Sequence, residues 1–545
     1  MPFTDRERRT ALGRVRSYLG ALGSVAGVVA RSRALRRIEL SFAFFKTTET
    51  ATWIAMLVYA FEKGGVTESG LLAAAVLVPA AIIAPLAAAV ADRYRPGVAL
   101  VVGYVILALT CLAVAAAMAA GLSRLPVYVL LGFVAVALTL IRPSQVVFAP
   151  AFARTPDELT ATNVVSGWIE SLAALVAPLI AGVLLALYAS AAVFVVMGAA
   201  CAAGALLIFP LRSVVAATPP NYDINAFDGL QLLRRDRNAR LLVLLLAAQF
   251  VVIGALDVLY VELAQGVLSL PTSWVGYLAA AFGAGGIVAA IVGATIVGSR
   301  RLIVPLGLSL GVWTAALLLL AATAAPATAL LLLAMAGGAR ATFDVVGRTL
   351  LQRVAPVNVH GRVFGLLEGL AMAAPAVGSF LAPALISIGG ASLAFIGVAA
   401  ILPLAALVAG RRFLAIDQHA RVPVVEIALL RSLPLFALLP PPTIESLARA
   451  LEPLSAKAGT DVIVQGDSGE TFYAIADGTV DVVRDESRVA GLSRGDGFGE
   501  LALLHNRPRN ATVTARSDCL LYTLSADVFV PALTGNARPI DEVRP

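Results

Sequence analysis

The sequence has few charged side chains for its length of 545 residues. Asp, Glu, Lys and Arg make up 14% of it, against about 25% in an ordinary soluble domain. Hydrophobic residues make up 59%, which excludes an ordinary soluble protein and predicts a membrane protein. The 41 Lys and Arg outnumber the 34 Asp and Glu, and the excess lies in short segments between apolar runs. That distribution predicts membrane orientation rather than a nucleic-acid partner.

Residues that bind metals or form disulfides are also scarce. The sequence has three Cys and three His, which are not grouped: Cys111, Cys201, Cys519, His360, His419 and His505. This excludes a disulfide framework, and no metal-ligand spacing is present. A Walker loop is missing, which argues against ATP hydrolysis. A TVGYG filter loop and a helix with Arg at every third position are missing too, which argues against an ion channel. We therefore expect no enzymatic activity, no metal and no cofactor.

Long apolar runs are numerous. A membrane helix needs about 20 apolar residues, and twelve such runs begin near residues 38, 68, 98, 125, 160, 189, 240, 273, 302, 326, 362 and 390. No cleavable signal precedes them. The first 37 residues are rich in Arg, and their apolar stretch 18–30 is too short to cross, so it is predicted to lie on the membrane surface.

Basic residues recur in every second connection between the runs, beginning with Arg93 and Arg95 and then at Arg154. Four of the other connections hold only one Lys and one Arg between them. Basic residues are retained on the cytoplasmic side of a membrane. The protein is therefore predicted to be a multi-pass protein of the cell membrane with both termini in the cytoplasm.

The apolar runs contain an internal repeat. "ESLAALVAPLIAG" from Glu170 and "EGLAMAAPAVGSF" from Glu368 occupy nearly the same place in two halves. Duplicated bundles with Pro and Gly interruptions are typical of alternating-access transporters. The predicted segments are a basic N-terminus (1–37), a first six-helix half (38–212), a cytoplasmic connection (213–239), a second six-helix half (240–412), a linker (413–423) and a C-terminal domain (424–545).

The segment "PLAAAVADRYRP" (85–96) resembles the loop between the second and third helices of the major facilitator superfamily. The resemblance extends over residues 38–412 and implies a secondary transporter. In that family an Asp-Arg pair and a further basic residue form a cytoplasmic latch, and Asp92, Arg93 and Arg95 stand at these positions. The counterpart in the second half, "VGSRRL", lacks the Asp, so the latch is expected on one side. The alternative is that these residues only hold a basic loop in place.

Ionisable residues inside the apolar runs are few, and each costs about 2.5 to 3.5 kcal/mol to insert. Lys46 and Glu49 lie three residues apart on the first helix, so they share a face and can neutralise each other. We predict that these two residues, with Asp257 and Arg340, line a central cavity in which a carboxylate is available for proton coupling. The alternative is that the charges pair to hold helices together. Less weight falls on the other charges in the runs: Arg142, Glu170, Asp344 and Glu368.

The C-terminal region has a different pattern. It predicts a helix, a proline break and a second helix from about Thr443, whose hydroxyl could cap it. From Lys457, short alternating segments separated by Gly-containing turns predict strands. Such strands after helices predict a small soluble β-barrel or jelly roll with flanking helices.

The stretch "GFGELALLHNRPRNATV" (497–513) combines a glycine turn, a short helix and an arginine. The start of a helix presents unpaired N–H groups to an anion. Arg509 can bind phosphate oxygens in bidentate fashion, and Glu500 can accept a hydrogen bond from a ribose hydroxyl. The predicted ligand therefore carries a sugar and a phosphate in one rigid molecule.

This stretch resembles the phosphate-binding cassette of cyclic nucleotide-binding domains, and the resemblance extends over about 424–531. It implies that Arg509 binds the cyclic phosphate and Glu500 the 2′-hydroxyl, and that backbone groups complete the cradle at Gly499, Leu501, Ala502 and Asn510. Cyclic-GMP-selective members tend to have Thr after the arginine, and many cyclic-AMP binders have a small residue. Asn510 fits neither pattern, and cyclic AMP is expected as the regulatory ligand rather than cyclic GMP. The alternative is a domain that no longer binds a nucleotide.

Family members usually continue into a long helix that closes over the base. Here such a helix is expected to be broken, because a proline inside a helix costs about 3 kcal/mol and the segment contains Pro531, Gly535, Pro539 and Pro545. The base is then covered by the membrane domain or by a neighbouring subunit, or it stays partly open. The oligomeric state is not predicted.

The sequence thus predicts a polytopic α-helical membrane protein followed by a small soluble β-domain. The predicted function is secondary active transport of a small amphipathic or apolar compound across the lipid bilayer. A proton is the candidate coupling ion, and cyclic AMP is the predicted regulator. One alternative is a receptor whose bundle does not transport. Others are a transporter whose β-domain is structural or dimerising, and, less favoured, a nucleotide-gated channel.

Overall fold

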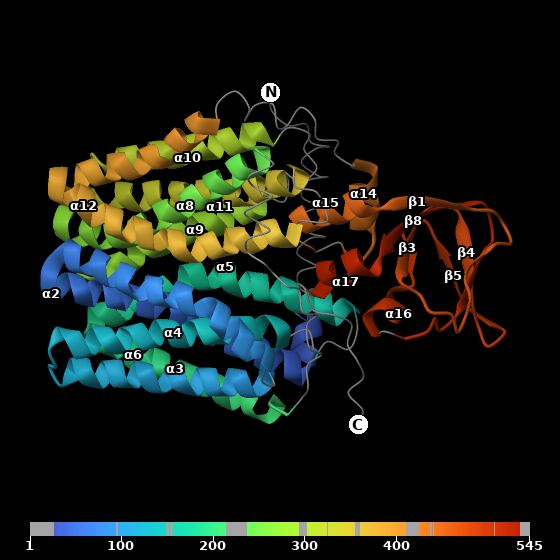
Figure 1. Ribbon diagram of the computed structural model, residues 1–545, viewed down its shortest axis with the longest axis horizontal. Helices are drawn as coiled ribbons and strands as arrows, with labels where there is room; N and C mark the ends of the chain where they lie inside the picture. Colours follow the sequence, from blue (N-terminus) through green and yellow to red (C-terminus); the bar gives the residue numbers. More distant parts are fainter. Residues whose placement is uncertain are drawn as a thin grey trace.

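The computed structural model describes residues 27–93, 96–148, 152, 156–213, 237–293, 302–323, 325–354, 360–409, 424–436, 439, 441–505 and 507–534. Long apolar helices form a bundle, and a β-rich domain projects from one end of it (Figure 1). We call this the near end and the opposite one the far end. The bundle consists of α2 (Arg33–Arg93), α3 (Pro96–Ala119), α4 (Arg124–Phe148), α5 (Pro156–Leu187), α6 (Ser190–Ile208), η2 (Phe209–Leu211), α8 (Arg237–Val261), the π-helical η3 (Glu262–Val267), α9 (Ser273–Gly293), α10 (Ile303–Leu320), α11 (Pro326–Val354) and α12 (His360–Ala409).

Within the described ranges, nine helical runs are long and apolar enough to cross a membrane, and α9 supplies a shorter apolar segment. The protein is therefore a multi-pass membrane protein, as predicted. Two helices, α2 with 61 residues and α12 with 50, contain non-helical glycine pairs at Gly64–Gly65 and Gly389–Gly390. The second glycine of each pair has a positive φ, 69° and 72°, which only glycine adopts readily.

Packing divides the bundle into two groups of helices. In the first, α3 packs against α4 and α6, and α2 packs against α4, α5 and α6. In the second, α8 packs against α12, and α11 packs against α9 and α10. The groups meet where α5 packs on α9 and α2 on α12. Glycines permit the first of these contacts, because a Cβ atom at Gly283 would lie 2.1 Å from the Ala174 carbonyl oxygen and one at Gly276 would lie 2.3 Å from that of Pro178.

The β-rich domain contains two antiparallel sheets between short helices (Figure 1). The sheet orders are β1-β8-β3-β6 and β2-β7-β4-β5. Its elements are α14 (Val424–Ser432), α15 (Pro441–Ala450), β1 (Glu452–Ala456), β2 (Asp461–Ile463), β3 (Thr471–Asp477), β4 (Thr479–Arg484), β5 (Ser487–Ser493), β6 (Gly497–Phe498), α16 (Glu500–His505), β7 (Thr512–Ala515), β8 (Cys519–Ser525) and α17 (Ala526–Thr534). Its core has two parts: a helical layer around Phe436, Phe472 and Phe529, whose rings contact one another, and a cluster between the sheets.

Three local predictions for this domain were wrong. The helix predicted to be capped by Thr443 begins at Pro441, so Thr443 lies in its first turn. The first strand begins at Glu452 rather than after Lys457, because β1 is an edge strand and an edge strand tolerates a proline. Pro531 lies inside α17 and does not break it. The buried side chains of neighbouring residues in α17 pack into the helical layer, and this packing outweighs the lost backbone hydrogen bond.

Several predictions fall outside the described residues. These are most of the surface stretch 18–30, most of the connection 213–239, the linker 413–423, Arg95 of the latch, and the lid positions Gly535, Pro539 and Pro545. Asp92 and Arg93 lie at the end of α2, but their side chains are also outside the description. The latch therefore stays a prediction.

Candidate functional sites

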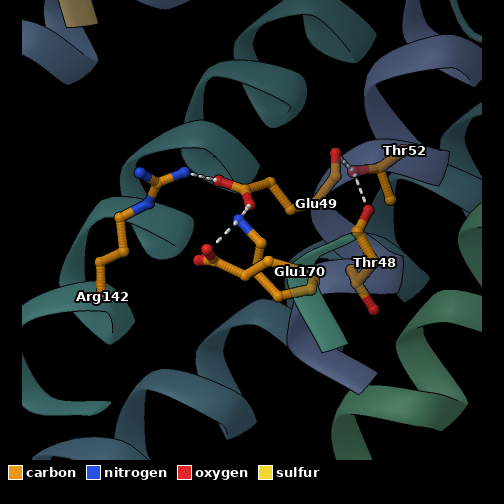
Figure 2. Close-up of polar contacts among 6 residues, drawn as sticks. Thr48, Glu49, Thr52, Arg142 and Glu170 are labelled. Atoms are coloured by element: carbon orange, nitrogen blue, oxygen red, sulfur yellow. Dashed lines mark hydrogen bonds and ion pairs between the residues drawn. The ribbon is translucent and has the colours of Figure 1, made fainter. Parts of the chain in front are cut away.

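The predicted pair of Lys46 and Glu49 is part of a larger cluster in the first group of helices. Lys46 Nζ on α2 donates to Glu49 Oε2 at 2.6 Å and lies 3.9 Å from Glu170 Oε1 on α5. Arg142 on α4 points toward Glu49 and donates to its other oxygen (Figure 2). The predicted ion pair is confirmed, and two residues given less weight complete the cluster. Glu49 is thereby neutralised by two cations that come from two helices.

A second cluster lies in the other group of helices. Arg348 Nε on α11 donates to Asp344 at 3.1 Å, and Gln249 Nε2 on α8 donates to the same carboxylate at 2.7 Å. Arg348 Nη1 also donates to Glu368 Oε1 on α12 at 2.8 Å. Sequence reasoning missed Arg348, although its spacing of four residues from Asp344 on one helix was a usable signal.

The two clusters approach each other through their exposed members. The side chains of Arg142, Glu170 and Glu368 are 51%, 59% and 60% exposed, whereas that of Glu49 is 23% exposed. Arg142 lies within electrostatic reach of both Glu170 and Glu368, which belong to different groups of helices. The charges therefore form a network that links the two groups.

Asp257 and Arg340 form a separate pair of neighbours. Trp53 Nε1 on α2 donates to Asp257 Oδ2 on α8 at 3.0 Å, which links the two groups of helices again. Arg340 on α11 lies within electrostatic reach of Asp257, and its Nε is buried without a hydrogen-bond partner among the described residues. The four predicted cavity residues thus lie as two pairs, Lys46 with Glu49 and Asp257 with Arg340. Their roles in a cavity stay predictions, and Trp53 was missed.

The predicted cassette forms one continuous turn in the β-rich domain. Gly499 adopts a φ of 94° between β6 and α16, a conformation that favours glycine. Arg509 folds back into this turn with a relative exposure of 6%. Its Nη1 donates to the Gly499 carbonyl at 2.9 Å, and its Nη2 donates to the Thr471 carbonyl at 2.7 Å. Burial holds the pKa of Arg509 below its usual value, and the nearby Tyr473 and Glu500 partly offset this effect.

Glycine is required at a second position beside this guanidinium. A Cβ atom at Gly469 would lie 1.8 Å from Arg509 Nε, so a larger residue there would displace the arginine. Thr471 and Gly469 were not predicted as part of the site. Both residues lie far from Arg509 in the sequence, so local patterns did not place them against it.

The other predicted cassette residues surround the same turn. Glu500 begins α16, and its carboxylate acts electrostatically on Arg509. Leu501 is 41% exposed and Ala502 is buried. The carbonyl of Asn510, the residue after the arginine, accepts a hydrogen bond from Arg484 Nε at 3.3 Å. The predicted residues therefore meet around one buried cation.

Two protein-family models match the chain. That of the Major Facilitator Superfamily matches residues 40–356, more than half of the chain. That of the cyclic nucleotide-binding domain matches residues 453–536.

Curated proteins and solved structures resemble a smaller part of the chain. The cAMP-dependent protein kinase regulatory subunit of Schizosaccharomyces pombe is 41% identical over 111 residues, 20% of this chain and 27% of the relative. That of Yarrowia lipolytica is 38% identical over 84 residues, 15% of this chain and 22% of the relative. A structure of the regulatory domain of Toxoplasma gondii PKA with cAMP has 34% identity and a TM-score of 0.20, and covers 21% of this chain and 46% of that one. The chain thus spans about a quarter of the length of these curated relatives.

Proposed function

Because the chain belongs to the Major Facilitator Superfamily and carries a cyclic nucleotide-binding domain, we propose that it is a secondary active transporter regulated by cytosolic cyclic AMP. Regulation by a nucleotide is supported by the position of Arg509, whose buried guanidinium donates to two carbonyl oxygens in the cassette turn. A guanidinium has five N–H donors, so donors remain for the oxygens of a cyclic phosphate.

The proposed topology has twelve crossings. At about 1.5 Å per residue, α2 and α12 are far longer than a bilayer core of about 30 Å, so each crosses twice and reverses at its glycine pair. Nine long runs, two of which cross twice, together with α9 then give twelve. Described basic residues end three helices of the bundle, at Arg93, Arg212 and Arg353. They support the proposal that the near end, the β-rich domain and both termini are cytoplasmic in the cell membrane.

The proposed transport mechanism is alternating access. The glycine contacts between α5 and α9 involve Ala174 and Pro178, in the second half of α5, which runs from the near end toward the far end. By contrast, Arg142, Glu170 and Glu368 are more than half exposed. This combination supports a state that is closed at the far end. Rocking of one half against the other would open the far end in turn.

The proposed substrate is a small amphipathic compound. Apolar helices surround the charge network, so a compound with an apolar body and one polar group suits this interior better than a wholly apolar one. Lys46, Glu49, Asp257 and Arg340 are proposed to line its path, and one of the carboxylates is proposed to carry a coupled proton.

In the β-rich domain, Arg509 is proposed to bind the cyclic phosphate and Glu500 the ribose 2′-hydroxyl. Backbone groups of Gly499, Leu501, Ala502 and Asn510 are proposed to complete the cradle. Cyclic AMP is preferred over cyclic GMP, and the similarity to regulatory subunits named for cAMP supports that choice.

Calorimetric titration of the full-length protein with each nucleotide tests this proposal. Loss of a hydrogen bond to a charged group costs about 1.5 to 3 kcal/mol, so Arg509→Ala should weaken cyclic AMP binding by about 10- to 150-fold or more. Arg488→Ala is the matched control, because it removes an arginine that is 54% exposed from the same domain. If neither nucleotide binds the unmodified protein, the regulatory part of the proposal is wrong.

A further inference from the structure

The near end of α5 enters the core of the β-rich domain. Leu159 has a relative exposure of 1% and is the one member of its hydrophobic cluster, as far as the structure is described, that comes from the bundle. The other members come from the β-rich domain and include Leu430, Leu503, Leu504, Phe529 and Leu533. One turn further along α5, the Asn163 side-chain amide donates to the carbonyl of Leu533 on α17. The first group of helices is thus anchored in the domain by a core residue and a hydrogen bond.

The near end of α11 makes a second contact with the same domain. Arg353 Nη2 donates to Glu445 Oε2 on α15 at 2.8 Å, and Arg353 Nε donates to the other oxygen of that carboxylate. The two side chains are 1% and 4% exposed. A bidentate pair of this kind fixes both position and orientation. The second group of helices is therefore anchored as well, through a different kind of contact.

The two anchors belong to different halves of the transporter. Alternating access requires the near ends of the halves to move apart and together. A compact domain that is attached to α5 on one side and to α11 on the other must move with the halves or restrain them. The domain lies beyond the near end of the bundle, where α15 contacts α11 and α17 contacts α5 (Figure 1).

The cassette itself takes part in the first anchor. Leu503 and Leu504 lie on α16, the helix that begins at Glu500 beside Arg509, and both belong to the cluster that receives Leu159. A shift of α16 on binding of a ligand would therefore change the packing around Leu159 directly. A two-state element that both sites bias is the physical requirement for coupling between them.

We propose that Leu159 on α5 and the Arg353–Glu445 pair on α11 form a two-point joint that transmits occupancy of the cassette to both halves of the bundle. This inference rests on the proposed function, because it takes cyclic AMP as the ligand of the cassette. In this arrangement the near end of α5 lies against α16 and α17. A change in the cassette on nucleotide binding therefore acts directly on a helix of the membrane domain.

Hydrogen–deuterium exchange on the full-length protein in lipid nanodiscs, with and without saturating cyclic AMP, tests the joint. Cyclic AMP should change exchange in residues 156–170 and 344–354 by about threefold or more, because exchange reports local opening. In Leu159→Ala, the change in 156–170 should disappear while calorimetry still detects cyclic AMP binding. Leu172→Ala, the same substitution at a position of α5 that is 53% exposed, should respond as the unmodified protein does.

A second variant guards against a general loss of folding in Leu159→Ala. Asn163→Ala removes the hydrogen bond to Leu533 without removing core volume. It should reduce the exchange difference in 156–170 while lowering the temperature of thermal unfolding much less than Leu159→Ala does. The proposed joint is wrong if the unmodified protein binds cyclic AMP but exchange changes in neither segment. It is also wrong if both variants show the full change in exchange. In both cases cyclic AMP binding by the β-rich domain is still supported. If the unmodified protein does not bind cyclic AMP, the proposed function fails, and the joint fails with it.

Discussion

Glu49 in the bundle and Arg509 in the β-rich domain satisfy their charges in different ways. Glu49 is held between the cations Lys46 and Arg142, so its charge is neutralised within the chain. The hydrogen bonds described for the Arg509 guanidinium go to two neutral carbonyl oxygens. A buried charge that is paired needs no ligand, whereas a buried cation held by neutral acceptors gains most from an incoming anion. Glu49 therefore contributes to the stability of the bundle besides its proposed place on the substrate path, whereas Arg509 keeps N–H donors for an anion.

The largest expected effect comes from a charge that is buried and fully paired. Glu445→Ala removes the carboxylate that receives Arg353, and breaking a buried ion pair costs about 3 to 5 kcal/mol. We expect the free energy of unfolding of the full-length protein to fall by that amount, as measured by chemical denaturation in detergent. Glu452→Ala, which removes an exposed carboxylate from β1, is the control. An equal effect of both substitutions would contradict the assignment.

The second-largest effect is expected at Arg509, where cyclic AMP binding should stabilise the protein. An unmodified sensor should gain about 2.7 kcal/mol of stability at a cyclic AMP concentration one hundred times its Kd. Arg509→Ala should lose this gain, and Arg509→Lys should lose most of it, because an ammonium cannot replace the planar guanidinium. Thermal unfolding with and without nucleotide measures the gain. A full gain in Arg509→Ala would place the ligand elsewhere.

A smaller effect is expected at the paired carboxylate in the bundle. Glu49→Gln leaves Lys46 and Arg142 without their shared anion, but Arg142 is about half exposed, so solvent screens the repulsion and the cost is about 1 to 2 kcal/mol. Denaturation of this variant beside Glu62→Gln, which alters an exposed carboxylate on the same helix, measures the difference. A stabilised Glu49→Gln would show that the cluster is kept for transport at the expense of stability.

The smallest effect is expected at the exposed edge of the same cluster. Glu170 lies 3.9 Å from Lys46 and is 59% exposed. Exposed pairs contribute about 0 to 1 kcal/mol, so Glu170→Gln should hardly change the free energy of unfolding. Any strong effect of this variant should appear in transport, measured as flux in proteoliposomes once a substrate is identified. A loss of stability as large as that of Glu49→Gln would break the distinction between exposed and buried members.

Local features of both regions could be predicted from the sequence. The pair of Lys46 and Glu49 follows from helical spacing, and the cassette from Gly499 to Arg509 lies within one short stretch. The partners that complete each site could not be predicted, because they are distant in the chain. Arg142 is 93 positions from Glu49, and Thr471 is 38 positions from Arg509.

Tertiary packing also overrode two kinds of local reasoning. Pro531 was expected to break a helix, yet burial of Phe529, Val530 and Leu533 holds α17 together around it. The pairing of Arg353 with Glu445 joins two domains across 92 positions. Nothing in the local sequence of Arg353 identified a buried partner.

We propose that nucleotide binding at the near end changes which end of the bundle is open. Spin labels on Leu122→Cys and Ile388→Cys, both exposed positions beside far-end turns in different halves, report this directly by pulsed EPR, and the three native cysteines are buried. Cyclic AMP should shift the distance distribution in this variant, and the shift should be absent when Arg509→Ala is added. An unchanged distribution in protein that calorimetry shows to be saturated with cyclic AMP would contradict this proposal.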